Sequence, residues 1–239
     1  QDDVAINNLG LIYLSKKEYQ KAKKCFFDSI KIKRNSKVFY YLSEVYKQLD
    51  NIEKAIFNLK ESIKILKEPN SLCNLGHLLY LSGEINDAEK YTNLALKYKP
   101  ELDIAYNNLG LINLSKGNLK TAKNNLLRAI KINKNNFMAH YNLSSITDYS
   151  IKNLHEKQLI NLLNSSINKN ELLHLSFALG KVYKDKKNYK KSFKYYKSAN
   201  FFKRKTFNYS IDDDKKKFLS IKKNFNAQLI NKYKDCGFN

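Results

Sequence analysis

The stretch VAINNLGLIYLSKKEYQKAKKCFFDSIKIKRN at residues 4–35 recurs as IAYNNLGLINLSKGNLKTAKNNLLRAIKINKN at residues 104–135. Between them lie VFYYLSEVYKQLDNIEKAIFNLKESI and SLCNLGHLLYLSGEINDAEKYTNLAL, which keep the same order of apolar and small residues. An internal repeat of this kind decides the architecture, because each unit has to bury its apolar face against the neighbouring units. The repeats predict an elongated array rather than one globular core.

One leucine in each repeat, followed by Gly or Ser, measures the period. These leucines are Leu9, Leu42, Leu75, Leu109, Leu143 and Leu179, with gaps of 33, 33, 34, 34 and 36 residues. A period of about 34 residues with a helix–turn–helix pattern is the signature of the tetratricopeptide repeat. The chain resembles that family, and the resemblance implies an all-α solenoid, a right-handed superhelix of antiparallel helix pairs.

Small residues stand where paired helices have to approach closely. They are Gly10, Gly76, Gly110 and Gly180 after the leucines, and Ala22, Ala55, Ala88, Ala122 and Ser192 in the second helices. Gly83 and Gly117 are expected in turns between paired helices. The fifth repeat is degenerate, because its second helix, LHEKQLINLLNSSI, lacks the small residue.

We therefore expect an array of about six helix pairs over residues 3–206 and a C-terminal helical extension over 207–239. The extension begins with Asp212, Asp213 and Asp214, which are favourable at a helix N-terminus and need no metal to explain them. Apolar residues follow at Phe218 and Ile221, so one or two helices are expected to cap the array or to lead out of it.

Composition narrows the class of protein further. No apolar run approaches the length of about 18 residues that a membrane-spanning helix needs. The cysteines Cys25, Cys73 and Cys236 are odd in number and far apart, which disfavours a disulfide framework or a zinc site. A reduced, cytoplasmic setting fits best.

The sequence offers no catalytic constellation. The four histidines are scattered, and neither a phosphate-binding GxxxxGK[ST] loop nor a GxSxG elbow is present. Cys73 and His77 stand one helical turn apart, but nothing marks an oxyanion hole beside them. We therefore predict no catalytic residue, no metal ligand and no cofactor site in this chain.

A solenoid of helix pairs is by default a binding surface, and its first helices line the concave groove. The residues expected to point into the groove are Asn7, Tyr40, Glu44, Asn74, His77, Asn107 and Tyr141. This polar, amide-rich and aromatic lining suits a protein partner or an extended peptide whose backbone needs hydrogen-bond partners. The competing interpretation is that Asn before the leucine, as at Asn8 and Asn108, serves local hydrogen bonding.

The net charge of +22 suggests a nucleic-acid ligand. However, only three of the 44 basic residues are arginine, the residue that a surface for phosphate or base recognition is expected to use more often. The aromatics Tyr189, Phe193 and Tyr196 have helical packing spacing, which assigns them to a core rather than to base stacking. Nucleic acid is therefore disfavoured. From residue 171 to the end, 18 basic residues face 6 acidic ones, which predicts an acidic partner or a second subunit near the C-terminal end.

A more specific resemblance covers LSFALGKVYKDKKNYKKSFKYYKSANFFKRKTFNYSIDDDKKKFLSIKKNF at 175–225. This segment resembles the one that joins the repeats to the catalytic domain in bacterial tetratricopeptide–sulfotransferase proteins. The matching residues are Phe177, Ala178, Leu179, Gly180, Lys181, Tyr183, Asp185, Tyr189, Phe193, Ala199, Asn200, Arg204 and Tyr209. Ser192, where the family has Ala, is a departure.

Two hypotheses follow. The first is the non-catalytic N-terminal array of a sulfotransferase, whose donor, 3′-phosphoadenosine 5′-phosphosulfate, would bind a further domain and none of the residues present. The second is a free-standing adaptor that binds an extended peptide or a partner protein.

Overall fold

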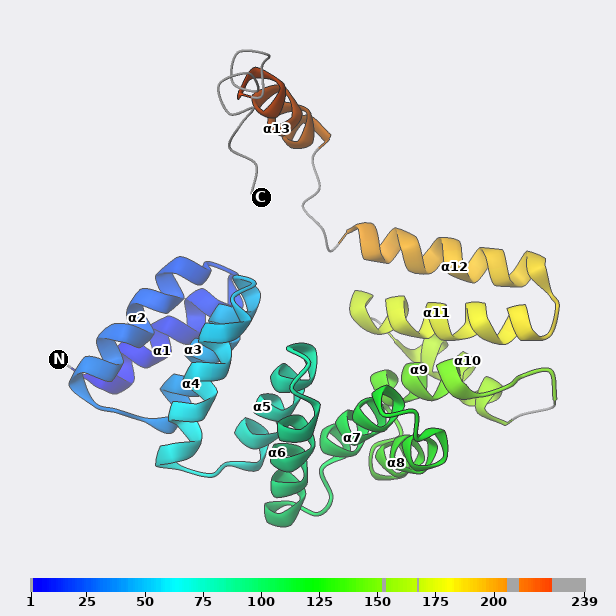
Figure 1. Cartoon of the computed structure of the whole chain (residues 1–239), viewed down its shortest axis with the longest axis horizontal. Helices are drawn as coiled ribbons and strands as arrows, with labels where there is room; N and C mark the ends of the chain where they lie inside the picture. Colours follow the sequence, from blue (N-terminus) through cyan, green and yellow to red (C-terminus); the bar gives the residue numbers. More distant parts are fainter. Residues whose placement is uncertain (1, 152–153, 167, 206–210, 225–239) are drawn as a thin grey trace, which may run out of the picture.

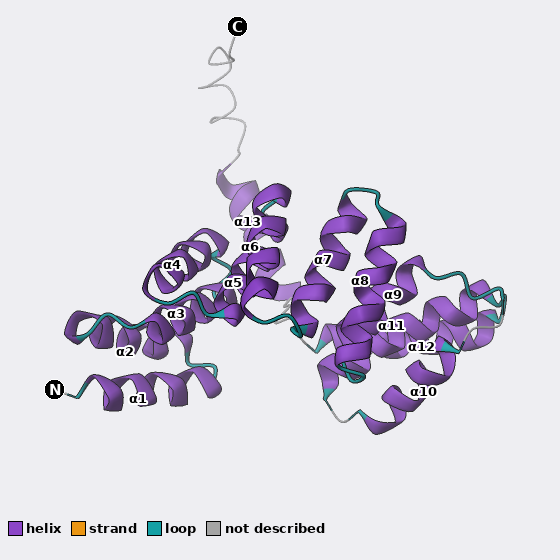
Figure 2. Ribbon diagram, turned by 90° about the horizontal axis from the view of Figure 1, so that it is seen from below, coloured by secondary structure: helices purple, strands orange, loops and turns teal. Residues whose placement is uncertain are grey.

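The computed structural model describes residues 2–151, 154–166, 168–205 and 211–224, and every regular element among them is an α-helix (Figure 2). The first helices of the pairs are α1 (Asp3–Ser15), α3 (Ser36–Gln48), α5 (Pro69–Leu81), α7 (Asp103–Ser115), α9 (Phe137–Ile146) and α11 (Lys169–Asp185). The second helices are α2 (Tyr19–Ile32), α4 (Ile52–Ile65), α6 (Ile85–Tyr98), α8 (Leu119–Ile132), α10 (His155–Ser165) and α12 (Tyr189–Arg204). A further helix, α13 (Ile211–Asn224), follows the array. None of these helices has the length and apolar character needed to cross a membrane.

Local sequence explains where the helices start and stop. Side chains of Asp2, Asn35 and Asn51 accept hydrogen bonds from backbone N–H groups at the starts of α1, α3 and α4. The turns inside the pairs place one residue at positive φ, and the predicted turn glycines Gly83 and Gly117 occupy that position. The equivalent residues in three other pairs are Lys17, Asp50 and Lys187.

Small residues let the two helices of a pair approach each other. A Cβ atom added at Gly110 would lie 2.6 Å from Cδ2 of Leu126 on the paired helix. Ala22 and Ala122 are fully buried on the second helices. The core is consequently a ribbon of leucines and alanines that follows the array instead of a single centre.

The helix pairs follow one another in an arc from α1–α2 to α11–α12 (Figure 1). Consecutive first helices contact each other, as α5 does with α7, α7 with α9 and α9 with α11. Second helices contact the next first helix and make no extensive contact with one another within the described ranges. Because the first helices are the more closely spaced row, they line the inner face of the arc.

The fifth pair departs from this scheme, as its sequence predicts. α9 packs on α8 and α11, and α10 packs on α11 rather than extensively on α9. Buried side chains link the two helices instead: His140 Nδ1 lies 2.8 Å from His155 Nε2, and Nδ1 of His155 lies 2.6 Å from the hydroxyl of Tyr149.

α13 has the acidic start that the sequence predicts, with Asp212, Asp213 and Asp214 in its first turn. Its apolar side chains, including Phe218 and Ile221, are exposed, and Figure 1 draws it apart from α12. The two roles expected for the extension, capping the array or leading out of it, both stay predictions. The expected boundary at 206/207, and a second helix after 224, lie outside the described residues.

Candidate functional site

The inner face of the arc carries the residues that the sequence singles out. Each of the seven predicted groove residues lies on a first helix, from Asn7 on α1 to Tyr141 on α9. They do not form one continuous site. Six of them fall into a polar cluster on α3 and α5, an amide pair between α7 and α9, and an aromatic cluster on α9 and α11, while Asn7 on α1 belongs to none of these groups.

The polar cluster consists of Tyr40, Glu44, Lys47, Asn74 and His77. The Asn74 side-chain amide donates to the Tyr40 hydroxyl at 3.1 Å and to Glu44 Oε1 at 3.4 Å. Glu44 Oε2 also accepts from Lys47 Nζ at 2.5 Å. Burial, and then the negative charge of Glu44, raise the pKa of Tyr40, so its hydroxyl stays protonated and able to donate.

His77 is the least satisfied member of the polar cluster. Burial and the nearby Lys47 lower its pKa, while Glu44 acts in the opposite direction, so the ring is neutral near pH 7. Its Nδ1 atom is buried without a hydrogen-bond partner among the described residues. The ring stacks on Tyr80 with 6.4 Å between centroids. A hydrogen bond between Nδ1 and a ligand group, formed after a small rotation of the His77 ring, would remove the cost of the unpaired nitrogen.

Asn107 does not line the groove in the way predicted. It is only 6% exposed, and its Oδ1 accepts a 2.8 Å hydrogen bond from Asn142 on α9. The neighbouring Asn108 donates to the backbone carbonyl of Cys73 at 3.2 Å. Both amides join adjacent repeats, so Asn107 and Asn108 have structural roles, but their hydrogen bonds are not the local ones that the competing interpretation expects. Asn7 is half-buried on α1, and its Oδ1 has no partner within the described part of the chain.

The aromatic cluster surrounds Tyr141. His174 lies 5.1 Å from it between ring centroids, and Phe177 lies 6.5 Å from it. Phe137 stacks on the other side of His174 at 5.8 Å, and Tyr196 of α12 closes the group against Phe177 at 6.2 Å. Sequence reasoning missed His174 and Phe177 as members. Phe177 stands two residues before its repeat leucine, the same position as Tyr40 and Tyr141, and that spacing could have found it.

The suspected Cys73–His77 dyad has no support. Burial raises the pKa of the Cys73 thiol to about 12, so almost no thiolate exists near pH 7. Its sulfur instead lies 3.3 Å from the Asn108 amide. Cys25 and Cys73 are both free thiols. No group of three His, Cys, Asp or Glu side chains within the described ranges could hold a metal ion.

Comparison with known families accounts for most of the array. Residues 2–99 match the model described as the SusR N-terminal TPR domain, and residues 104–136 and 173–200 match the tetratricopeptide repeat model. The chain is a tetratricopeptide repeat protein. The stretches that these models leave unmatched include 137–172, which holds α9 and α10. No curated protein sequence matches the chain.

Solved tetratricopeptide structures share the fold at low sequence identity. PilW, a type IV pilus biogenesis factor, has a TM-score of 0.65 and 18% identity over 81% of this chain and 90% of its own. PilF of Pseudomonas aeruginosa has a TM-score of 0.63 and 20% identity over 81% and 88%. YrrB, a tetratricopeptide protein with an unusual peptide-binding site, has a TM-score of 0.52 and 23% identity over 57% and 72%. At these identities the similarity shows the fold alone.

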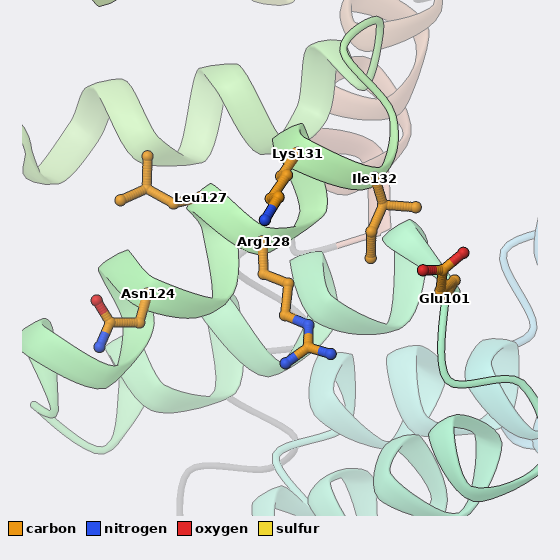
Figure 3. A pocket seen from close by; sticks show the side chains of 6 residues that line it. All are labelled: Glu101, Asn124, Leu127, Arg128, Lys131 and Ile132. Atoms are coloured by element: carbon orange, nitrogen blue, oxygen red, sulfur yellow. The ribbon is translucent and has the colours of Figure 1, made fainter.

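A separate hollow lies along α8, away from the inner face of the tetratricopeptide array (Figure 3). Its lining comes from α8 except for Glu101, which lies in the loop between α6 and α7. Arg128 of the lining is already engaged, because its guanidinium lies 4.6 Å from the centre of the Tyr106 ring. A single helix with side chains of mixed charge forms no enclosed site, so the inner face remains the better candidate.

Proposed function

We propose that the tetratricopeptide array binds an extended peptide segment of a partner protein along its inner face. The observation that carries this proposal is the polar cluster, in which a half-buried amide, a phenol and a carboxylate meet beside an unpaired imidazole. Amide and hydroxyl groups of this kind can exchange hydrogen bonds with a peptide backbone. YrrB, which shares the fold, is described as having a peptide-binding site, and this supports the choice of ligand class.

The aromatic cluster supplies the second half of the proposed mechanism. Tyr141 and Phe177 are half-buried on the same face, two and three repeats further along than Asn74. Rings at such positions offer apolar surface to a side chain of the bound segment, while the polar cluster fixes its backbone. The proposal therefore expects a ligand with an aliphatic or aromatic residue several positions away from the part that contacts Asn74.

The test is selection of binders from a library of random peptides displayed on phage, followed by fluorescence titration of the selected peptide. The variant Asn74→Ala should weaken binding about tenfold, because a central polar contact is lost and Glu44 loses a donor. The matched control is Asn124→Ala, which removes the same amide from the α8 hollow and should leave binding unchanged. Equal binding by both variants would place the ligand elsewhere.

A second proposal is that the array is the non-catalytic N-terminal part of a sulfotransferase. It rests on the resemblance over 175–225 alone, and no residue of this chain is assigned to the sulfate donor. In that case the array would position an acidic acceptor or a second subunit near its basic C-terminal end, in the reduced cytoplasm. Reading the coding sequence past Asn239 tests it: a strand, a phosphate-binding loop and a helix within about thirty residues support it, and a stop codon removes it.

A further inference from the structure

The first helix exposes a face that the later repeats bury. Leu9 and Ile12 of α1 are 43% and 50% exposed, whereas their counterparts in the second repeat, Leu42 and Val45, are fully buried. Ala5 is exposed on the same side of α1, one turn before Leu9. In α3, α5, α7 and α11 this stripe is covered by the preceding helix pair. The α1 stripe, Ala5, Leu9 and Ile12, is therefore one half of a repeat-to-repeat joint.

The opposite end of the array exposes the other half. Tyr189 and Phe193 of α12 are 68% and 70% exposed, so the prediction from their spacing that they belong to a core is wrong for both. Their equivalents in the second repeat, Ile52 and Ile56 of α4, are partly buried and pack against the core. In the joints α2–α3, α4–α5 and α6–α7 the following first helix contacts the second helix, and the hydroxyl of Tyr19, the counterpart of Tyr189 on α2, donates to Gln48 of α3 at 3.4 Å. The α12 stripe, Tyr189 and Phe193, accordingly lacks the first helix that would cover it.

Charge distinguishes between the helices that could cover the α12 stripe. Residues 189–205 carry seven basic residues and no acid, while residues 2–15 carry Asp2 and Asp3 and no base. α13 also has exposed apolar residues, but its five lysines outnumber its three aspartates, so it would place positive charge against positive charge. The acidic α1 is the better electrostatic match for α12.

The positions of these charges agree with the geometry of a joint. α3 begins four residues after α2 ends, so a first helix starts beside the end of the preceding second helix. An α1 placed on α12 in the same way would bring its first turn, with Asp3, beside the last turn of α12, with Lys203 and Arg204. Opposite charges would then meet at the rim of an apolar contact.

We propose that the α12 end of one copy of this chain binds the α1 end of a second copy, which continues the solenoid from molecule to molecule. The two stripes are different surfaces, so the contact is heterologous, and successive copies add head to tail into open chains. This self-association goes beyond peptide binding, because it uses the two ends of the array and leaves the inner face free.

Sedimentation velocity of the 239-residue chain over a range of concentrations tests the proposal. The parent chain should form concentration-dependent species larger than a dimer. The variants Ile12→Asp and Phe193→Asp should each weaken association about tenfold or more, because each buries a carboxylate in the apolar contact. Phe57→Asp, which changes an exposed apolar residue on α4, is the matched control and should associate like the parent.

Mixing separates a head-to-tail contact from other arrangements. Ile12→Asp keeps an intact α12 stripe and Phe193→Asp keeps an intact α1 stripe, so together they should form a 1:1 dimer and nothing larger. A parent that stays monomeric, or a mixture that forms no dimer, would overturn the proposal. A Phe218→Asp variant that associates while the parent stays monomeric would show that α13 covers the α12 stripe instead. Circular dichroism of every variant checks that the helices are retained.

Discussion

Gly110 and Leu126 show how one pair of positions sets the spacing between two helices. Leu126 is fully buried, and its Cγ and Cδ atoms occupy the space that faces Gly110. A methyl group at Gly110 would meet Leu126 Cδ2 at 2.6 Å and Cγ at 2.7 Å. Because Cγ is only one rotatable bond from the Leu126 backbone, the clash can be relieved only by forcing Leu126 into another rotamer inside the packed core or by moving the helices apart.

We expect Gly110→Ala to lower the free energy of unfolding by about 1 kcal/mol or more. Overpacking costs about 1–3 kcal/mol, and the better helix propensity of alanine returns at most about 1 kcal/mol. Urea denaturation followed by circular dichroism measures the change. In a Leu126→Ala background the space is open, so adding Gly110→Ala should then be neutral or stabilising. Destabilisation of the same size in both backgrounds would disprove the packing explanation.

The buried histidines of the fifth repeat form a one-way chain of hydrogen bonds. The Lys134 carbonyl can only accept, so His140 Nε2 donates to it, at 3.0 Å, and His140 Nδ1 accepts from His155 Nε2. The Tyr149 hydroxyl then donates to His155 Nδ1. All four ring nitrogens of His140 and His155 have a hydrogen-bond partner when both rings are neutral. Burial, and then the neighbouring His140, lower the pKa of His155 to about 3.

This arrangement predicts a loss of stability in mild acid. The folded-state pKa of His155 lies below the unfolded value of about 6.5, so the unfolded chain binds more protons and its population rises as the pH falls below that value. Between pH 6.5 and 5 the loss from His155 should be about 2 kcal/mol. His155→Gln should show a shallower pH dependence in this range and the same flat dependence as the parent above pH 7.5. Urea midpoints across pH 5–8.5 provide the measurement, and identical slopes for both proteins would contradict it.

At the scale of elements, the short α9 and the displaced α10 depend on α11. Lys181 Nζ donates to the Thr147 carbonyl at 2.5 Å and pairs with Asp185, whose Oδ2 accepts from the Tyr149 backbone N–H at 3.2 Å. Lys181 and Asp185 therefore hold the segment that follows α9. Both belong to the stretch that resembles the sulfotransferase proteins, and the structure gives them a packing role.

The variant Asp185→Ala should loosen the segment around Thr147 and Tyr149 and α10 after it. It leaves a half-buried ammonium without its carboxylate and a backbone N–H without its acceptor, which costs about 1–3 kcal/mol locally. Hydrogen–deuterium exchange should become faster over 147–165 and stay unchanged over α3 to α6. Asp28→Ala, which removes an exposed i,i+3 ion pair on α2, should change neither region. Faster exchange throughout the array would instead indicate a global loss of stability.

The sequence predicted those parts of the molecule that repeat. Leucines and small residues recur at fixed spacing, so the helix pairs and their buried positions could be inferred from single residues such as Leu75 and Ala88. The placement of α10 could not, because His140 stands at a regular repeat position but its partner His155 lies in a segment without the repeat's small-residue pattern. Burial of Asn107 was missed for a related reason: its partner Asn142 lies in the next repeat, and one side chain does not reveal whether an amide faces solvent or a neighbour.

At the scale of the whole molecule, the described part of the array is held together by contacts between neighbouring repeats. The free energy of unfolding should therefore be distributed over the individual repeats and the joints between them. α1 to α8 pack in four regular pairs, and of these eight helices only α7 and α8 contact α9 extensively. In a solenoid the stability of a part is close to the sum of its repeats and the joints between them. We therefore expect the irregular fifth pair to be the boundary between two parts of the array whose stabilities are nearly independent.

We therefore expect residues 1–136 to fold without the rest of the chain. The fragment keeps the joints α2–α3, α4–α5 and α6–α7, and it loses the cover that α9 gives to Leu126 and Ile130 on α8 and the hydrogen bond from Asn142 to Asn107 on α7. Circular dichroism should show a helical fragment that unfolds cooperatively, with a smaller urea m-value than the full chain because less surface is exposed on unfolding. Shortening by one further pair, to 1–99, should lower the midpoint again while keeping the helical signal. If 1–136 is unfolded although 1–239 is folded, the C-terminal pairs contribute stability beyond their own joint, and the array is one cooperative unit rather than a sum of neighbours.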